Sequence, residues 1–372
     1  MDKELFLKNL KDYLRILGAY LNKQTIDFKL DESNLPFFVN LSKSHSLTAL
    51  FYKAVKDTNA DISEEHLKKL EKYYLSNVKK CVLFEQERNE LYKFLNENNI
   101  LYLPLKGLIL KDYYLDPYTR EFADNDIYFD GKDKLIKKYF VDRGYQVELY
   151  RKSNHDIYQK KPCLNFEMHR ALFGETGDNQ KFLEYFKKPQ IKLVNQGSLE
   201  CCYSLDNFYV YFTAHTYKHF HISGCGLRTL VDYYVFLKKN ELDFKYINNE
   251  LNKIDLLDFP NDISSLAIKV FDEKELNEKE LEMLLFIASS GTYGTLENEV
   301  NKRVKERGKF RYFMSRIFPP YRYYKNAYPW AYKTVILIPI AWLVRAVKVL
   351  FKNPKKATTE LKMIAKSKEE KE

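Results

Sequence analysis

The chain has 372 residues, 45% of them hydrophobic, with 61 Lys plus Arg against 51 Asp plus Glu and only 12 Gly and 11 Pro. This composition argues against disordered and collagen-like classes, because apolar side chains suffice to bury a core and glycine and proline are scarce. The five cysteines include no C-x-x-C pair, so neither a disulfide framework nor a zinc site is indicated.

The chain begins with Met-Asp-Lys-Glu-Leu-Phe, in which acidic residues stand where an export signal would carry basic ones, so we expect a cytoplasmic protein. A second helix is expected from Ser63, a helix-capping residue type, to about Asn96. Residues 1–98 are predicted to form an N-terminal helical region, because apolar residues recur at helical spacing, first at Leu5, Leu10, Leu14 and Leu17.

The pattern changes over residues 99–200, where short apolar runs typical of strands occur at 100–105, 127–129, 145–150 and 164–168. Helical periodicity returns over residues 201–306 and continues through a basic, aromatic segment over 307–351. We therefore predict a helix-rich α+β fold, in which a small mixed sheet is flanked by helical regions.

Positive charge is concentrated at the C-terminal end, since residues 301–372 carry 19 Lys plus Arg and 5 Asp plus Glu. Residues 352–372 are lysine-rich with little apolar periodicity, and we expect a disordered tail that is dispensable for folding. An anionic partner or a membrane surface is expected to meet this end of the chain. The longest apolar run, residues 335–344, is too short to span a bilayer.

Two aspartates stand at the start of the strand predicted around residues 127–129. Asp124 and Asp126 are separated by one residue, so an extended chain projects both side chains from one face. Ile127 and Phe129 then point toward the core. This spacing allows both carboxylates to reach one divalent-ion site.

The strand predicted at 164–168 supplies a third carboxylate. Alternation places Glu167 and His169 opposite the apolar Phe166 and Met168. Three neighbouring carboxylates are unfavourable unless cations neutralise them, and Mg2+ (or Mn2+) prefers oxygen ligands. We therefore expect a two-metal site at Asp124, Asp126 and Glu167. His169 is expected either to hold one of these carboxylates in place or to be a reacting group itself.

Three segments of the chain resemble the uncharacterised nucleotidyltransferase family of the DNA polymerase beta-like superfamily. They are LPLKGLILKDYYLDPYTREFADNDIYF at 103–129, NFEMHRALF at 165–173 and HTYKHFHISGCGLRTLVDYYVF at 215–236. The resemblance covers the middle third of the chain well and the helical flanks loosely. It implies a polymerase-beta-like fold and transfer of an NMP from an NTP to an acceptor, with release of pyrophosphate.

The resemblance also implies roles for six residues of this chain. It assigns catalysis and metal binding to Asp124, Asp126 and Glu167. It assigns nucleotide binding to Lys106, Gly107 and Arg120. The acceptor stays open between a small molecule, a sugar, a protein and an RNA end.

The glycine turn departs from the superfamily's usual Gly-Gly or Gly-Ser, since Lys106-Gly107 is followed by Leu108. This departure favours an alternative, a catalytically inactive module of the same fold that binds a nucleotide or a partner. Nucleic-acid modification is a weaker possibility that rests only on the basic end. His215 and His219 lie one helical turn apart but lack the Glu of H-E-x-x-H, so we expect them to brace the cleft.

Overall fold

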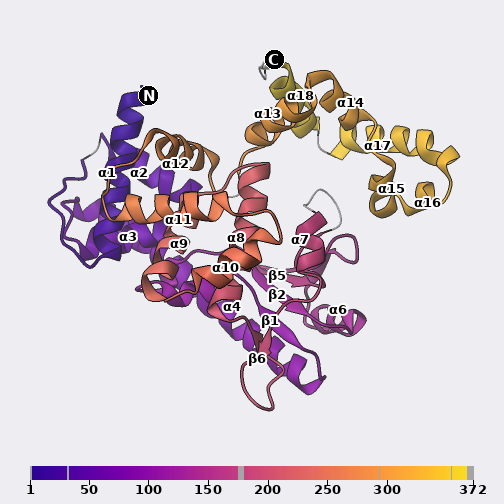
Figure 1. The fold of residues 1–372 in the computed structure, drawn as a ribbon, viewed down its shortest axis with the longest axis horizontal. Helices are drawn as coiled ribbons and strands as arrows, with labels where there is room; N and C mark the ends of the chain where they lie inside the picture. Colours follow the sequence, from indigo (N-terminus) through magenta and orange to yellow (C-terminus); the bar gives the residue numbers. More distant parts are fainter. Residues whose placement is uncertain (1, 32, 175–179, 293, 353, 367–372) are drawn as a thin grey trace. The chain divides into compact units, whose positions relative to one another are not determined.

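The computed structural model describes residues 2–31, 33–174, 180–292, 294–352 and 354–366. The chain divides into two units, one comprising Met1–Tyr217 and Gly226–Thr292, the other Lys218–Cys225 and Tyr293–Glu372. The boundaries expected after residues 98 and 200 therefore fall inside the first unit. The predicted α+β class, rich in helix with a small mixed sheet, is confirmed (Figure 1).

Helices precede the sheet, as the periodicity predicts. They are α1 (Lys3–Leu21), α2 (Leu35–Ser44), α3 (Thr48–Asp57) and α4 (Glu64–Glu97). The side chain of Ser63 accepts a hydrogen bond from the backbone N–H of His66 and so caps α4. The helix predicted from Ser63 to about Asn96 is thus confirmed.

The main sheet has the strand order β1-β2-β5-β4-β3. Its strands are β1 (Tyr102–Pro104), β2 (Asn125–Phe129), β3 (Gln146–Leu149), β4 (His155–Lys160) and β5 (Leu164–His169). Only the β2–β5 pair is parallel, and the other neighbours are antiparallel. Four strands match predicted apolar runs, whereas β4 was not predicted, because its sequence alternates weakly between apolar and polar residues.

One face of this sheet forms the core of the nucleotidyltransferase-like region that the sequence predicts. Figure 1 places α4 and α6 (Asp133–Asp142) beside the strands. Side chains of both helices pack in one core with the inward residues of β2 and β5, which are Ile127, Phe129, Leu164, Phe166 and Met168, and with Tyr102 of β1 and Tyr158 of β4. This packing confirms the alternation read from the sequence and leaves the opposite face of β2 and β5 to the polar residues.

The remaining elements of the first unit lie between the strands of the sheet and after it along the chain. Between strands lie α5 (Gly107–Leu110), η1 (Lys111–Tyr113) and η2 (Pro117–Thr119). After the sheet come α7 (Gln180–Tyr185), the β6 (Lys192–Leu193) and β7 (Cys201–Cys202) pair, α8 (Leu205–Ile222), α9 (Leu227–Lys239), α10 (Phe244–Asn252), α11 (Asp258–Phe271) and α12 (Glu278–Ser290). The last residues of α8, 218–222, belong to the second unit.

A buried histidine joins distant helices of this unit. The backbone N–H of Leu227 donates to Nδ1 of His45 at 3.0 Å, so Nε2 carries the ring proton and donates to the carbonyl of Ala288 at 3.0 Å. Both ring nitrogens are therefore used by the neutral tautomer. Burial lowers the pKa of His45 to about 4, and the charge of Arg228 adds to this effect.

We expect acid to destabilise the first unit through His45. Between pH 6.5 and about 4 the ring binds a proton in the unfolded chain but not in the folded one, so stability falls as the pH falls. The parent should lose about 3 kcal/mol more than His45→Asn between pH 7 and pH 4. Urea unfolding of both proteins at each pH measures this difference, and equal losses would contradict the assignment.

The second unit contains helices along nearly all of its described length. They are α13 (Leu296–Arg307), α14 (Lys309–Ile317), α15 (Tyr321–Ala327), α16 (Pro329–Tyr332), η3 (Val335–Leu337), α17 (Ile338–Lys352) and α18 (Pro354–Lys366). Within the described parts of both units, the search for bilayer-spanning helices finds none that is sufficiently long and apolar.

The expectation of a disordered tail over 352–372 is wrong for residues 354–366, which form α18. Ile364 is buried against Val300, Val304 and Tyr312. Glu360 is also buried, and it accepts hydrogen bonds from Tyr312 at 3.0 Å and from Arg316 at 2.8 Å. The pattern was missed because few apolar residues serve this helix, whose other contacts are polar. Residues 367–372 lie outside the described part of the chain.

Replacing Ile364 with Ala is expected to destabilise the second unit by about 2–5 kcal/mol, because it leaves a cavity in a small core. Leu361→Ala is the matched control on the same helix, since Leu361 is 47% exposed, and it should change stability little. Thermal unfolding followed by calorimetry distinguishes them. Equal midpoints for the two variants would mean that α18 is not packed.

Candidate functional site

The parallel pair β2 and β5 brings two predicted acidic residues side by side. Asp126 and Glu167 are paired across the ladder. Their neighbours along the strands, Ile127 and Phe166, are buried in the core on the other face. Backbone pairing, rather than a loop, therefore fixes the relative position of the two carboxylates.

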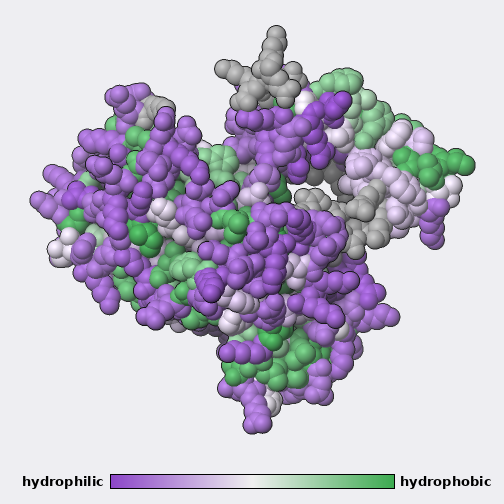
Figure 2. All heavy atoms as spheres, in the orientation of Figure 1, coloured by the Kyte–Doolittle hydropathy of each residue, from purple (hydrophilic) through white to green (hydrophobic). Residues whose placement is uncertain are grey.

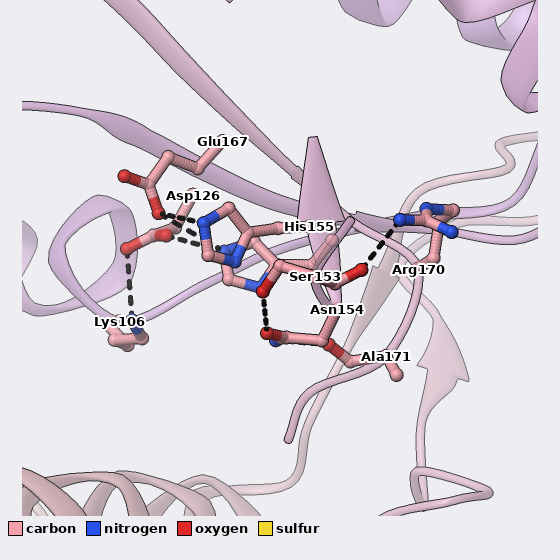
Figure 3. Close-up of polar contacts among 9 residues, drawn as sticks. Lys106, Asp126, Ser153, Asn154, His155, Glu167, Arg170 and Ala171 are labelled. Carbon is pink, nitrogen blue, oxygen red and sulfur yellow. Dashed lines mark hydrogen bonds and ion pairs between the residues drawn. The ribbon is translucent and has the colours of Figure 1, made fainter. Parts of the chain in front are cut away.

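Asp126 is the centre of the polar contacts (Figure 3). Lys106 Nζ lies 3.2 Å from its Oδ2, and His169 Nε2 donates to its Oδ1 at 2.7 Å. Burial acts to raise the pKa of Asp126, but Lys106 and His169 outweigh it, so the pKa lies well below its ordinary value. Asp126 is thus a buried, fully ionised carboxylate.

Burial and the negative charge of Asp126 both raise the pKa values of Glu167 and Asp124. Burial raises the pKa of Glu167 to about 7, and the charges of Asp126 and Asp124 contribute. Burial also raises the pKa of Asp124, which directly precedes β2, and Asp126 is the next cause. Mutual repulsion among three carboxylates is what a bound cation would relieve, and their oxygens suit Mg2+ or Mn2+. The residues present therefore fit a divalent metal.

Two histidines extend the cluster beside Glu167. His155 Nε2 lies 3.6 Å and His169 Nε2 3.9 Å from Glu167 Oε2, and the three donor atoms lie within 4.8 Å of one another. His155 and His169 are paired across β4 and β5. His169 thus contacts both Asp126 and Glu167, and its bracing role stays a prediction.

His155 was not singled out from the sequence. Its position depends on the antiparallel pairing of β4 with β5, which is secured where the strands meet by two hydrogen bonds (Figure 3). Arg170 donates to the carbonyl of Ser153 at 2.7 Å, and Asn154 donates to that of Ala171 at 2.9 Å. The fourteen-residue separation from His169 carries no motif, so only a correct strand assignment could have found His155.

The turn at Lys106-Gly107 leads into the short helix α5. Lys106 has a φ of 37°, a conformation that non-glycine residues rarely adopt. A Cβ atom on Gly107 would lie 2.6 Å from Nη1 of Arg120, so only glycine fits there. Glycine is therefore explained here by the close approach of a guanidinium.

Arg120 itself is buried in an ion pair with α9. Its Nε and Nη2 donate to the two carboxylate oxygens of Asp232 at 2.8 and 2.9 Å, and Tyr114 donates to the same carboxylate at 2.7 Å. Burial acts to lower the pKa of Arg120, but Asp232 outweighs it and the net shift is upward. Its contact with a nucleotide stays a prediction.

His215 and His219 lie on α8, whereas the acidic cluster lies on and beside the strands β2 and β5. His215 lies on α8 near the rings of Tyr211 and Phe173, at 6.2 and 6.5 Å between centroids. His219 belongs to the second unit. The bracing role expected of both stays a prediction.

Comparison with known proteins identifies one family. The model of the uncharacterised nucleotidyltransferase family matches residues 31–272, which include the sheet, the acidic cluster and α9. No curated protein and no solved structure matches the chain.

Proposed function

The chain belongs to the uncharacterised nucleotidyltransferase family, and we propose that it moves a nucleoside monophosphate from an NTP to an acceptor, with release of pyrophosphate. The acceptor class is left open between a small molecule, a sugar and a protein. The observation that carries the proposal is the meeting of Asp126 and Glu167 at His169, with Asp124 beside them.

Asp124, Asp126 and Glu167 would hold the divalent metal, for which their oxygens are suitable ligands. Such ions, when bound, offset the charge of the triphosphate and align the attacking and leaving oxygens. His169 would keep Asp126 in place through its hydrogen bond. The remaining residues would position the nucleotide and move a proton.

Glu167 is the residue that we assign to the proton. Without a bound metal, burial and the neighbouring carboxylates raise the pKa of Glu167 to about 7, so this carboxylate binds a proton more readily than an ordinary glutamate. A bound cation would lower this pKa. Glu167 would take the proton of the acceptor hydroxyl while the hydroxyl oxygen forms a bond to the α-phosphorus of the NTP. The bond between the α-phosphorus and the pyrophosphate leaving group would break in the same step. His155, 3.6 Å from the carboxylate, would orient it.

Lys106 and the turn would steady the triphosphate. Lys106 Nζ already lies among the acidic residues and can donate to a phosphate oxygen as a point charge. Arg120, held by Asp232, would support the backbone at Gly107 from beneath. It would thereby position the turn in addition to any direct contact with the nucleotide.

Changing Glu167 to Gln is expected to lower kcat by about 100-fold or more while the KM for the NTP changes little, because the amide cannot accept the proton. Glu148→Gln, an exposed glutamate on β3, is the matched control and should retain the parent rate. Steady-state kinetics over a range of NTP concentrations give kcat and KM for both variants. A parental kcat for Glu167→Gln would remove this role.

An inactive nucleotide-binding module is the second candidate. Two observations favour it: Lys106 occupies an oxygen of Asp126, and the guanidinium of Arg120 fills the space beside Gly107. This candidate predicts binding of an NTP without turnover.

Labelling at two positions of the NTP tests the proposal. The full chain is incubated with each NTP carrying the label at the α- or the γ-phosphate, with Mg2+ or Mn2+ and a cell extract. Nucleotidyl transfer places the α-label on an acceptor and the γ-label in pyrophosphate. Binding without incorporation supports the inactive module, and incorporation of the γ-label would contradict both candidates.

A further inference from the structure

An apolar stripe runs along one side of η3 and α17 in the second unit. Ile336 is 83% exposed, Ile340 50%, Leu343 69% and Val347 53%, and Val335 beside them is 67% exposed. The spacing of four, three and four residues places these side chains on one helical face. Figure 2 shows strongly hydrophobic surface where η3 and the start of α17 lie in Figure 1.

The opposite face of α17 is already packed. Ile338 and Ala341 are buried with Tyr324 and Tyr328. Lys348 Nζ lies 4.9 Å from the ring centroid of Tyr328, on this inner side of the helix. The exposed stripe is therefore not the face that holds the helix to its own unit.

The stretch of sequence that contains the stripe carries charge of one sign. Residues 308–359 contain eleven Lys and Arg side chains and no Asp or Glu. Tyr321, Tyr323 and Trp330 are each between 39% and 43% exposed in the same segment. Apolar side chains with amphipathic aromatics and lysines on a helix are typical of peptides that lie at a lipid interface.

We propose that η3 and α17 bind the surface of an anionic lipid bilayer, with the apolar stripe inserted at the level of the headgroups. α17 has 15 residues, so it would lie in the plane of the surface. Anionic lipid complements a segment without acidic residues, whereas a second copy of the same face would oppose cation to cation. This proposal does not depend on the nucleotidyl-transfer activity.

Both tryptophans of the chain, Trp330 and Trp342, lie in this segment, so intrinsic tryptophan fluorescence reports on it directly. Full-length chain is mixed with vesicles of phosphatidylcholine, with or without phosphatidylserine, at low and high salt. We expect a blue shift, quenching by brominated lipid and co-sedimentation with the serine-containing vesicles. Salt should weaken this binding.

The variant Ile336→Glu/Leu343→Glu should bind these vesicles at least about tenfold more weakly, since it replaces two inserting side chains with charges. The matched control is Leu75→Glu/Val82→Glu, two exposed positions of α4 in the first unit, which should bind as the parent does. Circular dichroism confirms that each variant is folded.

Several results would overturn the proposal. They are absence of vesicle binding at low salt, equal binding by the parent and the stripe variant, and binding to nucleic acid in place of vesicles. Self-association that the stripe variant abolishes, without vesicle binding, would assign the face to a second copy instead.

Discussion

Replacing Asp126 with Asn is expected to reduce nucleotidyl transfer by roughly 1000-fold or more, because a central ligand loses the charge that a metal site needs. The amide oxygen can still accept the hydrogen bond from His169, so the sheet should remain folded. Binding of Mn2+ and NTP should weaken together, and isothermal titration calorimetry of each ligand measures this.

Asp130→Asn is the matched control for this prediction. Asp130 directly follows β2 and is exposed, so its substitution removes the same charge from the same strand region without touching the cluster. Parental metal binding by Asp126→Asn would show that the carboxylate cluster is not the metal site. Weakening of both variants alike would assign the effect to net charge.

Replacing Asp232 with Ala is expected to destabilise the first unit by about 3–5 kcal/mol, because Arg120 is left buried with an uncompensated charge. The hydroxyl of Tyr114 loses its acceptor in the same step. Urea unfolding of the full chain measures the loss. Removing the cation as well, in Arg120→Met/Asp232→Ala, should recover part of it.

The exposed pair Asp262 and Lys279 is a control for ion pairing as such. Their atoms approach to 2.7 Å, as close as the buried pair, but both side chains are solvated. Asp262→Ala should therefore change stability by about 1 kcal/mol or less. Similar losses for Asp232→Ala and Asp262→Ala would mean that burial of Arg120 does not govern the effect.

Local periodicity was sufficient to predict four of the five strands of the main sheet and the two faces of β2 and β5. Side chains of a strand alternate between its two faces, so a few neighbouring residues are enough to show the pattern. This alternation correctly placed Ile127 and Phe166 in the core. It also placed Asp126 and Glu167 on a common face, where the parallel pairing of β2 and β5 brings them together.

What the sequence could not supply depends on contacts between distant segments. His155 joins the cluster through strand pairing, and Arg120 finds Asp232 on a helix 112 residues later. Apolar periodicity does not predict the helix α18, because its buried Glu360 accepts hydrogen bonds from Tyr312 and Arg316 and this polar packing leaves no apolar pattern. Polar and charged side chains can be buried only where they have hydrogen-bonding partners, and these partners are brought near by the tertiary fold.

The ion pair between Arg120 and Asp232 joins residues that are synthesised at different times. The ribosome synthesises Gly107, Asp124, Asp126 and Glu167 before α9. Arg120 therefore has no ion-pair partner until residue 232 has been synthesised. A fragment limited to residues 99–200 would carry every predicted catalytic carboxylate while leaving the guanidinium of Arg120 without its counterion. The shortest fragment that keeps the Arg120–Asp232 ion pair must therefore include α9, although no predicted catalytic carboxylate lies on that helix.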